Sequence, residues 1–95
     1  MHVISQKRLR EFWLRHADAE APLRSWFRVA RKARWQTFVD IRSTYASAGL
    51  VGKFMVFNIG GNKYRLIAEA NFKTHKLFVR HVLTHADYDK GKWKL

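Results

Sequence analysis

The chain has 95 residues, of which 47% are hydrophobic and 15% aromatic, ample for one compact core, so we predict a single domain over residues 1–95. Nineteen Lys and Arg against seven Asp and Glu give a formal net charge of +12, which favours a polyanionic partner, most often nucleic acid. The absence of cysteine excludes disulfides, thiolate metal sites and cysteine nucleophiles. Residues 1–7 lack the apolar region of a signal peptide and no apolar run approaches the roughly 20 residues that cross a bilayer, so we expect a cytoplasmic protein.

The first part of the chain predicts a short strand and two amphipathic helices. Residues 1–4 read as the strand, Ser5 is placed to cap a helix over 6–16, and a second helix follows Asp18 with Pro22 in its first turn. Apolar side chains recur in both helices at the i, i+3, i+4, i+7 spacing of one face: Leu9, Phe12, Trp13 and His16, then Leu23, Trp26, Phe27 and Ala30. We expect the helices to pack as a hairpin with these faces in the core.

The other face of the second helix is basic. Arg24, Arg28, Arg31 and Lys32 lie at i, i+4, i+7 and i+8, with hardly an acid to pair with. Like charges at this spacing repel by a few tenths of a kcal/mol each. Nucleic acid phosphates or the acidic surface of a protein partner would offset the repulsion, and a merely solvated face is the remaining alternative.

The second half of the chain predicts a sheet. A capping-box-like spacing from Thr37 to Asp40 indicates a short third helix, and residues 48–52 read as a connector. The hydrophobic period then changes to 2, and the expected strands cover 53–59, 63–70 and 77–84, with Gly60-Gly61-Asn62 as a hairpin turn, a second turn over 71–76 and a short helix from Ala86. The predicted fold is α+β, of order β-α-α-β-β-β, with the two N-terminal helices packed on a small antiparallel sheet.

The strand over 63–70 carries the first candidate catalytic residue, Arg65. Alternation places Leu66 on one face of this strand and Arg65, with Lys63, on the other. If the helices cover the Leu66 face, Arg65 and Lys63 stand on an open sheet face where an RNA can lie. The planar fork of an arginine suits a phosphate that gains charge in its transition state, so Arg65 takes an electrostatic role. A structural pairing with Glu69 on the same face is the alternative.

His85 and Tyr88 are candidates for proton transfer. Cleaving RNA without a metal requires a base that takes the 2′-OH proton, an acid that protonates the leaving 5′-oxygen, and cations around the phosphorus. Histidine is the side chain best tuned for these proton steps near neutral pH. His85 stands where the last strand ends and the terminal helix begins, and Tyr88 follows three residues later on the same helical face.

The other histidines give weaker signals. His75 lies in a turn, and His81 alternates with Arg80, so that one of these two faces the core and the other faces out. Together with His85 they form no recognised zinc spacing, and we expect no metal site. Gly60-Gly61 lacks the following Lys-Ser or Lys-Thr and the helix of a nucleotide-binding loop, so no cofactor is expected either.

Two stretches carry a resemblance to a known family: N-x-G-G-N-x-Y-R-L over 58–66 and T-H-x-x-Y-D over 84–89. They resemble the HigB-type toxins of type II toxin-antitoxin pairs, members of the RelE-like group of messenger RNA endonucleases. The resemblance runs from residue 1 to near Trp93 and is specific in the second half. It implies a RelE-like fold and a toxin that enters the decoding site of the ribosome and cuts messenger RNA, leaving 2′,3′-cyclic phosphate and 5′-OH ends.

The resemblance also implies an antitoxin and a set of site residues. Such toxins are neutralised by a helix-turn-helix antitoxin encoded beside them. The catalytic set of the RelE-like group contains an Arg in the Y-R-L strand, matched by Arg65, and an Arg, His or Tyr near the C-terminal end, matched by His85 and Tyr88. The basic residues that the group carries on the preceding strand have no match within 54–58, where only Lys53 stands at the start. The general base is therefore open among His85, Tyr88 and Lys53.

The predicted function is the toxin of a type II toxin-antitoxin system, a ribosome-associated endoribonuclease that cleaves messenger RNA by metal-independent 2′-OH attack. The candidate RNA or phosphate contacts are Lys53, Lys63, Arg80, Arg28 and Arg31. The alternative is a non-catalytic basic RNA-binding module whose exposed aromatic side chains stack bases. A basic membrane-surface protein fits less well, because the basic helix face lies opposite aromatic residues that the core needs. The expected partners are messenger RNA, the ribosome and the antitoxin, with no membrane.

Overall fold

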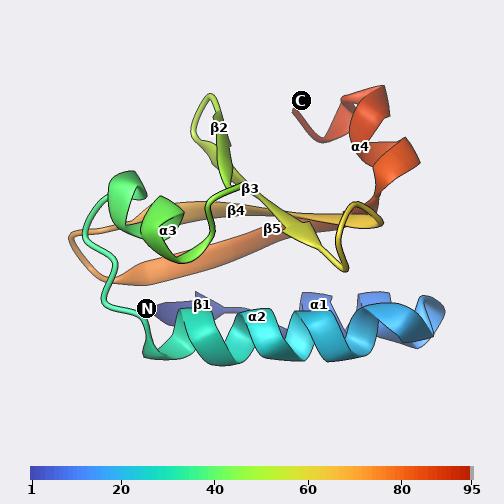
Figure 1. Cartoon of the computed structure of the whole chain (residues 1–95), viewed down its shortest axis with the longest axis horizontal. Helices are drawn as coiled ribbons and strands as arrows, with labels where there is room; N and C mark the ends of the chain where they lie inside the picture. Colours follow the sequence, from blue (N-terminus) through green and yellow to red (C-terminus); the bar gives the residue numbers. More distant parts are fainter. Residues whose placement is uncertain (95) are drawn as a thin grey trace.

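The computed structural model describes residues 1–94, which form two layers, a helical hairpin and a sheet, with a short helix on the far side of the sheet (Figure 1). The elements in chain order are β1 (His2–Ile4), α1 (Gln6–Arg15), the 3₁₀ turn η1 (Ala17–Ala19), α2 (Glu20–Lys32), α3 (Phe38–Thr44), β2 (Gly49–Val51), β3 (Phe54–Ile59), β4 (Tyr64–Asn71), β5 (Lys76–Thr84), α4 (His85–Lys90) and the 3₁₀ turn η2 (Lys92–Lys94). The α+β class and the helical hairpin are confirmed.

The sheet has the strand order β1-β5-β4-β3-β2. The three long strands pair antiparallel as predicted, but β1 lies parallel to β5, so the sheet is mixed. The prediction of a connector over 48–52 was wrong in part, because Gly49–Val51 forms β2 and pairs antiparallel with β3. A strand of three residues that contains a glycine gives too short an alternation to stand out in the sequence.

Helices α1 and α2 cover one face of the sheet, here called the inner face (Figure 1). Leu9 from α1 and Trp26 from α2 are buried there in one cluster with Phe57 of β3 and Leu66 of β4. These are the faces that the helical spacing predicted for the core. Their burial fixes which side of the sheet faces away from the hairpin.

Capping explains where two of the shorter helices begin. The Thr37 hydroxyl accepts from the Asp40 N–H, and the Asp40 carboxylate accepts from the Thr37 N–H, which is the reciprocal capping box that the sequence predicted for α3. Thr84 caps α4 by accepting from the Asp87 N–H at 3.1 Å. Ser5 holds the N-cap position of α1 but its side chain makes no capping hydrogen bond, so that part of the prediction was wrong.

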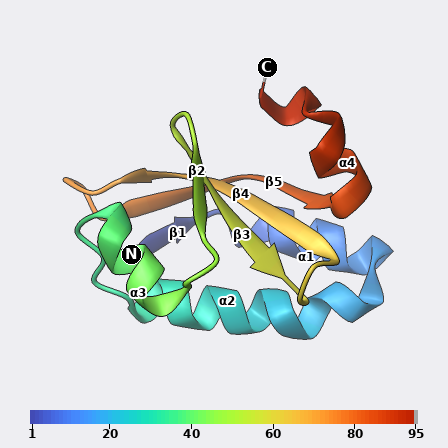
Figure 2. The ribbon, with the colours of Figure 1, turned by 45° about the horizontal axis from the view of Figure 1, so that its top comes forward.

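The opposite side of the sheet, here called the outer face, carries Arg65, Ile67 and Glu69 of β4. Helix α4 and the turn η2 fold back over one end of it, as the view in Figure 2 shows. Trp93 of η2 is buried there against Ile67 and Val56, in a second small apolar cluster. Within residues 1–94, α4 and η2 thus cover the part of the outer face from Arg65 to Ile67.

Candidate active site

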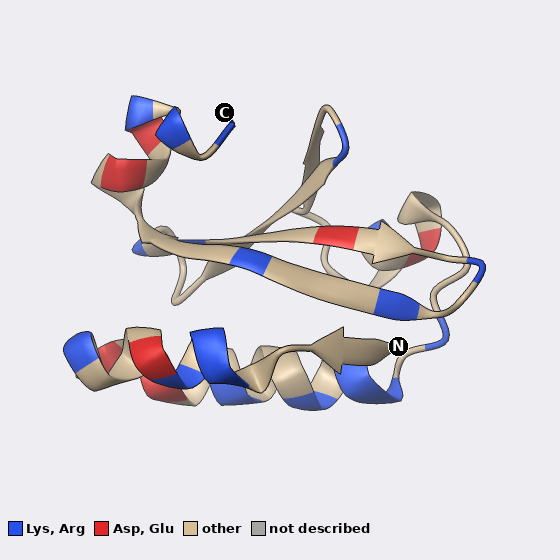
Figure 3. Cartoon of the chain, turned by 180° about the vertical axis from the view of Figure 1, so that it is seen from behind, with Lys and Arg blue, Asp and Glu red and all other residues tan. Residues whose placement is uncertain are grey.

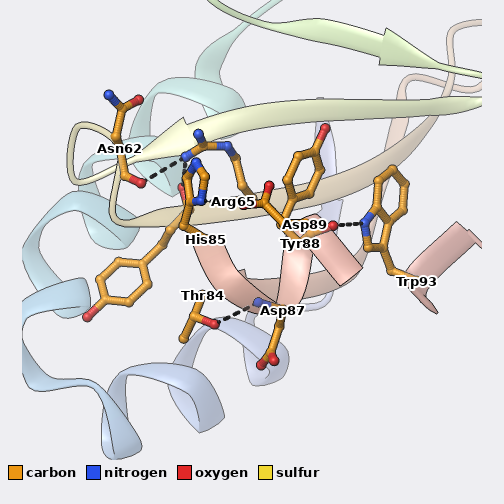
Figure 4. A network of polar contacts seen from close by, with 9 residues as sticks. Asn62, Arg65, Thr84, His85, Asp87, Tyr88, Asp89 and Trp93 are labelled. Atoms are coloured by element: carbon orange, nitrogen blue, oxygen red, sulfur yellow. Dashed lines mark hydrogen bonds and ion pairs between the residues drawn. The ribbon is translucent and has the colours of Figure 1, made fainter. Parts of the chain in front are cut away.

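Arg65 lies near the start of β4, on the outer face, under α4. Its Nη1 donates to the main-chain oxygens of Asn62 at 3.2 Å and Tyr64 at 3.1 Å, and its guanidinium carbon lies 5.6 Å from the centre of the Tyr88 ring (Figure 4). Alternation had placed Arg65 opposite Leu66, which is confirmed. The expectation of an open site was wrong, because the residue is only 8% exposed. The cover comes from α4, which no local pattern around Arg65 predicts.

His85 is the first residue of α4 and is exposed. Its main-chain N–H donates to the Lys63 carbonyl at 3.0 Å, which ties the start of α4 to the start of β4. Its Nδ1 lies 3.0 Å from a carboxylate oxygen of Asp89, one helical turn on. A carboxylate in this position orients the imidazole, as a positioned proton-transfer group requires.

The ring of Tyr88 lies between Arg65 and a tryptophan. It stacks on Trp93 with centroids 5.2 Å apart and planes at 14°, and the Trp93 indole N–H donates to the Tyr88 carbonyl at 3.0 Å. Tyr88 is thus held on one side by a buried ring and meets a guanidinium on the other. Arg65 of β4 and the pair His85 and Tyr88 of α4 come together at one end of the outer face (Figure 4).

Lys63 does not join this group, contrary to the sequence prediction. Its Nζ lies 2.8 Å from a carboxylate oxygen of Asp18 in η1, and the Tyr64 hydroxyl donates to the other oxygen of the same carboxylate at 2.5 Å. The hydrogen bond from Lys63, and then that from Tyr64, lowers the pKa of Asp18 below its usual value. Lys63 therefore belongs to a tie between the hairpin turn and the helical layer.

Lys53 and Arg80 meet farther along the outer face, at Glu69. The Arg80 Nε lies 3.0 Å and the Lys53 Nζ 3.8 Å from the same carboxylate oxygen. The alternative pairing of Glu69 with Arg65 is therefore wrong. The expected alternation of Arg80 with His81 is also wrong, because the register of β5 shifts between the partners of Ile67 and Ala68 and makes Arg80 an extra residue.

Arg28 and Arg31 lie exposed on α2, while the buried side of that helix faces the sheet. They lie on the helical layer, away from the outer face. Figure 3 shows that Lys and Arg occur on both layers. Arg24 departs from the prediction of unpaired cations, since its Nε lies 2.7 Å from Glu20 and its guanidinium stacks over Trp13.

Comparison with known proteins identifies the family. The family model described as "HigB_toxin, RelE-like toxic component of a toxin-antitoxin system" matches residues 19–91. The chain belongs to this family. It is 31% identical to the mRNA interferase HigB of Escherichia coli O6:H1, over 95% of this chain and 90% of the relative. It is also 28% identical to the mRNA interferase toxin HigB of Escherichia coli K12, over 94% of this chain and 88% of the relative.

Within residues 1–94 of this HigB-family toxin, no three His, Asp or Glu side chains come together as metal ligands would.

The pKa of His81 is lowered by partial burial and by the nearby charges of Arg8 and Arg80. No helix in the described part of the chain is both long and apolar enough to pass through a bilayer.

Sequence reasoning missed three residues that contact candidate site residues. Asp89 had a signal, because a carboxylate four residues after His85 on a helix faces it. Trp93 had none, since its position under Tyr88 depends on a turn that follows α4. Asp18 lies 45 positions from Lys63, a separation that no motif bridges.

Proposed function

We propose that this toxin is an endoribonuclease that cleaves messenger RNA on the ribosome, without a metal ion, by attack of the 2′-OH on the adjacent phosphate. The observation that carries the proposal is the juxtaposition of the Arg65 guanidinium with Tyr88 and with the His85–Asp89 pair. Both relatives named above are mRNA interferases by name, and a net charge of +12 suits an RNA substrate.

Arg65 stabilises the charge that develops on the phosphate oxygens. Two main-chain carbonyls fix its Nη1, so the guanidinium is oriented before substrate arrives. Preorganised donors of this kind need no rearrangement in the transition state, which is the reason they lower the barrier. Arg65 also offers further N–H groups beyond Nη1, since a guanidinium has five.

Proton transfer falls to His85 and Tyr88. One group removes the 2′-OH proton and the other protonates the 5′-oxygen as the P–O5′ bond breaks, which leaves a 2′,3′-cyclic phosphate and a 5′-OH. Lys53, the third candidate base, pairs with Glu69, four positions along β4 from Arg65. That separation, together with the Asp89 carboxylate on the His85 imidazole, favours the two residues of α4.

The proposal includes two partners. A helix-turn-helix antitoxin neutralises the toxin, and the ribosome presents the message. The exposed Arg28 and Arg31 on the helical layer offer a basic surface for either partner that leaves the outer face free for RNA.

Expression of the chain alone tests the proposal. We expect growth arrest and loss of translated messages, measured by colony formation and by primer extension on a reporter transcript. Because ribosomes require Mg²⁺, the mechanism is read from the RNA ends. Cyclic phosphate and 5′-OH ends support side-chain catalysis, and 5′-phosphate ends point to a metal-activated water instead. Normal growth with soluble toxin present would leave the non-catalytic RNA-binding module as the better account.

A further inference from the structure

The uncovered half of the outer face contains a pocket. Helix α4 and η2 cover the end of the sheet that holds Arg65, and the other end stays open (Figures 1 and 2). There, β4, β5 and the turn between them enclose about 490 Å³, lined by two phenylalanines, two cations and one acid: Phe72, Phe78, Lys73, Arg80 and Glu69. Of these lining residues, only Arg80 was named above as a candidate phosphate contact, and the catalytic roles proposed above do not use the pocket.

Phe78 is the central aromatic side chain of the pocket. It stands opposite Glu69 in the β4–β5 register, so it lies on the outer face, and it is only partly buried. The guanidinium carbon of Arg80 lies 4.9 Å from the centre of its ring, and Arg80 also binds Glu69. Lys53 reaches the same carboxylate from the β2–β3 hairpin. The single acid is thus paired with two cations, and the rim of the pocket carries excess positive charge.

A partly exposed aromatic ring beside cations on an open sheet face is an arrangement that binds unpaired nucleotides. The ring stacks a base of any sequence, and the cations bind its phosphate. The excess positive charge of the rim favours a polyanion such as RNA over an uncharged protein surface. The pocket lies on the same face as the candidate active site, because Glu69 follows Arg65 by four positions on the same side of β4, a separation of about 14 Å. Trp93, which covers Ile67, stands between the two.

We propose that this pocket is a second RNA-binding site, which holds one unpaired nucleotide of the substrate with its base on Phe78 and its phosphate at Arg80 and Lys73. The inference rests on the proposed function, since it assumes that the scissile phosphate lies at Arg65. It predicts that an RNA must extend beyond the cleaved dinucleotide to bind with full affinity.

The test uses single-stranded oligonucleotides in which every 2′-OH is methylated, so that they bind but cannot be cut. Fluorescence anisotropy compares an octamer and a dinucleotide on the whole toxin. Phe78→Leu keeps an apolar side chain and removes the ring, and Phe78→Tyr keeps the ring. We expect Phe78→Leu to weaken octamer binding by roughly 5- to 150-fold, the range for one stacked base. Octamer binding should stay unchanged in Phe78→Tyr and in the control Leu14→Ala, which alters the exposed surface of α1. Dinucleotide binding should stay unchanged in every variant.

Equal octamer affinity for Phe78→Leu and the parent toxin, with both folded by circular dichroism, would overturn the proposal. So would a loss of antitoxin binding in Phe78→Leu with RNA binding intact, because the pocket would then be a protein site. Cleavage of cellular messages by the parent toxin is measured in parallel. If the parent does not cleave but still binds the octamer through Phe78, the proposed function fails and this site stands.

Discussion

Arg65 is the residue whose environment differs most from the sequence expectation. As a surface arginine it would be replaced with little loss of stability, but its guanidinium makes one buried and one partly buried hydrogen bond and packs against Tyr88. We expect Arg65→Ala to lower the free energy of unfolding by about 1.5–3 kcal/mol, the usual range for hydrogen bonds to a charged group. It should also slow cleavage by roughly 10²- to 10³-fold, enough to abolish toxicity.

The two effects of Arg65→Ala are separated by a control. Arg65→Lys keeps the positive charge but loses the planar fork, so it should recover part of the stability and little of the rate. Thermal melting and primer extension on the same preparations measure both. Full toxicity of Arg65→Ala at normal expression would show that the active site lies elsewhere.

Tyr88 offers either a hydroxyl for proton transfer or a ring for packing. Tyr88→Phe keeps the contacts with Trp93 and Arg65 and loses only the hydroxyl, whereas Tyr88→Ala loses both. If the hydroxyl transfers a proton, cleavage by Tyr88→Phe should fall by about 10²-fold or more with an unchanged melting temperature. Activity equal to that of the unmodified toxin in Tyr88→Phe, lost in Tyr88→Ala, would assign the residue to packing alone.

At the scale of elements, Asp18 joins the helical layer to the sheet. Its carboxylate binds the side chains of Lys63 and Tyr64, and the main chain of the same segment binds His85 and Arg65. The pKa of Asp18 is lowered, chiefly by the hydrogen bond from Lys63, so the tie is complete above its ordinary value of 3.8 and is lost as pH falls through the lower folded value. The pKa values of its partners, Lys63 and Tyr64, are raised above ordinary values that already lie above neutrality.

Asp18→Asn should therefore lower the melting temperature at pH 7 and flatten its decline in acid. The comparison is with Glu11→Gln, which removes the same charge from an exposed position on α1. Melting curves from pH 7 to pH 2 give the measurement. If the melting temperature of Asp18→Asn falls in acid as steeply as that of the unmodified toxin, other carboxylates cause the acid destabilisation.

Local patterns predicted the elements of this fold better than the contacts between them. Strand alternation put Arg65 opposite Leu66 correctly, because it depends only on neighbours in the chain. The cover over Arg65, the Asp18–Lys63 tie and the extra residue at Arg80 all depend on segments that meet only after folding. The grouping of Arg65, His85 and Tyr88 was expected from the family resemblance, and their catalytic roles stay a prediction.

At the scale of the whole molecule, cations lie on both layers (Figure 3). A short RNA and a ribosome should therefore contact different sets of Lys and Arg side chains. Each phosphate contact on single-stranded RNA contributes about 0.7 to the slope of log K against log salt. For a short methylated oligonucleotide, replacing Lys53 and Arg80 by Ala should reduce the slope by about 1.4, and replacing Arg28 and Arg31 should leave it unchanged.

For ribosome binding, replacing Arg28 and Arg31 should instead reduce the slope of log K against log salt. Sedimentation over a salt series measures it. This design treats the two double variants as controls for each other, because each removes two positive charges from the same protein. A reduced oligonucleotide slope in the Arg28 and Arg31 variant would show that RNA reaches the helical layer. An unchanged ribosome slope would leave that layer to the antitoxin.

The parallel pairing of β1 with β5 has a consequence for the timing of synthesis. His2 pairs with Lys76, so the first strand waits for 74 further residues before it has a neighbour. At about 5–20 residues per second this delay is roughly 4–15 s, and the sheet that buries the faces of α1 and α2 is incomplete throughout. His85 and Tyr88 are made later still. On the proposed function, a toxin directed against translation is thus harmless to the ribosome while β5 and α4 are still being made.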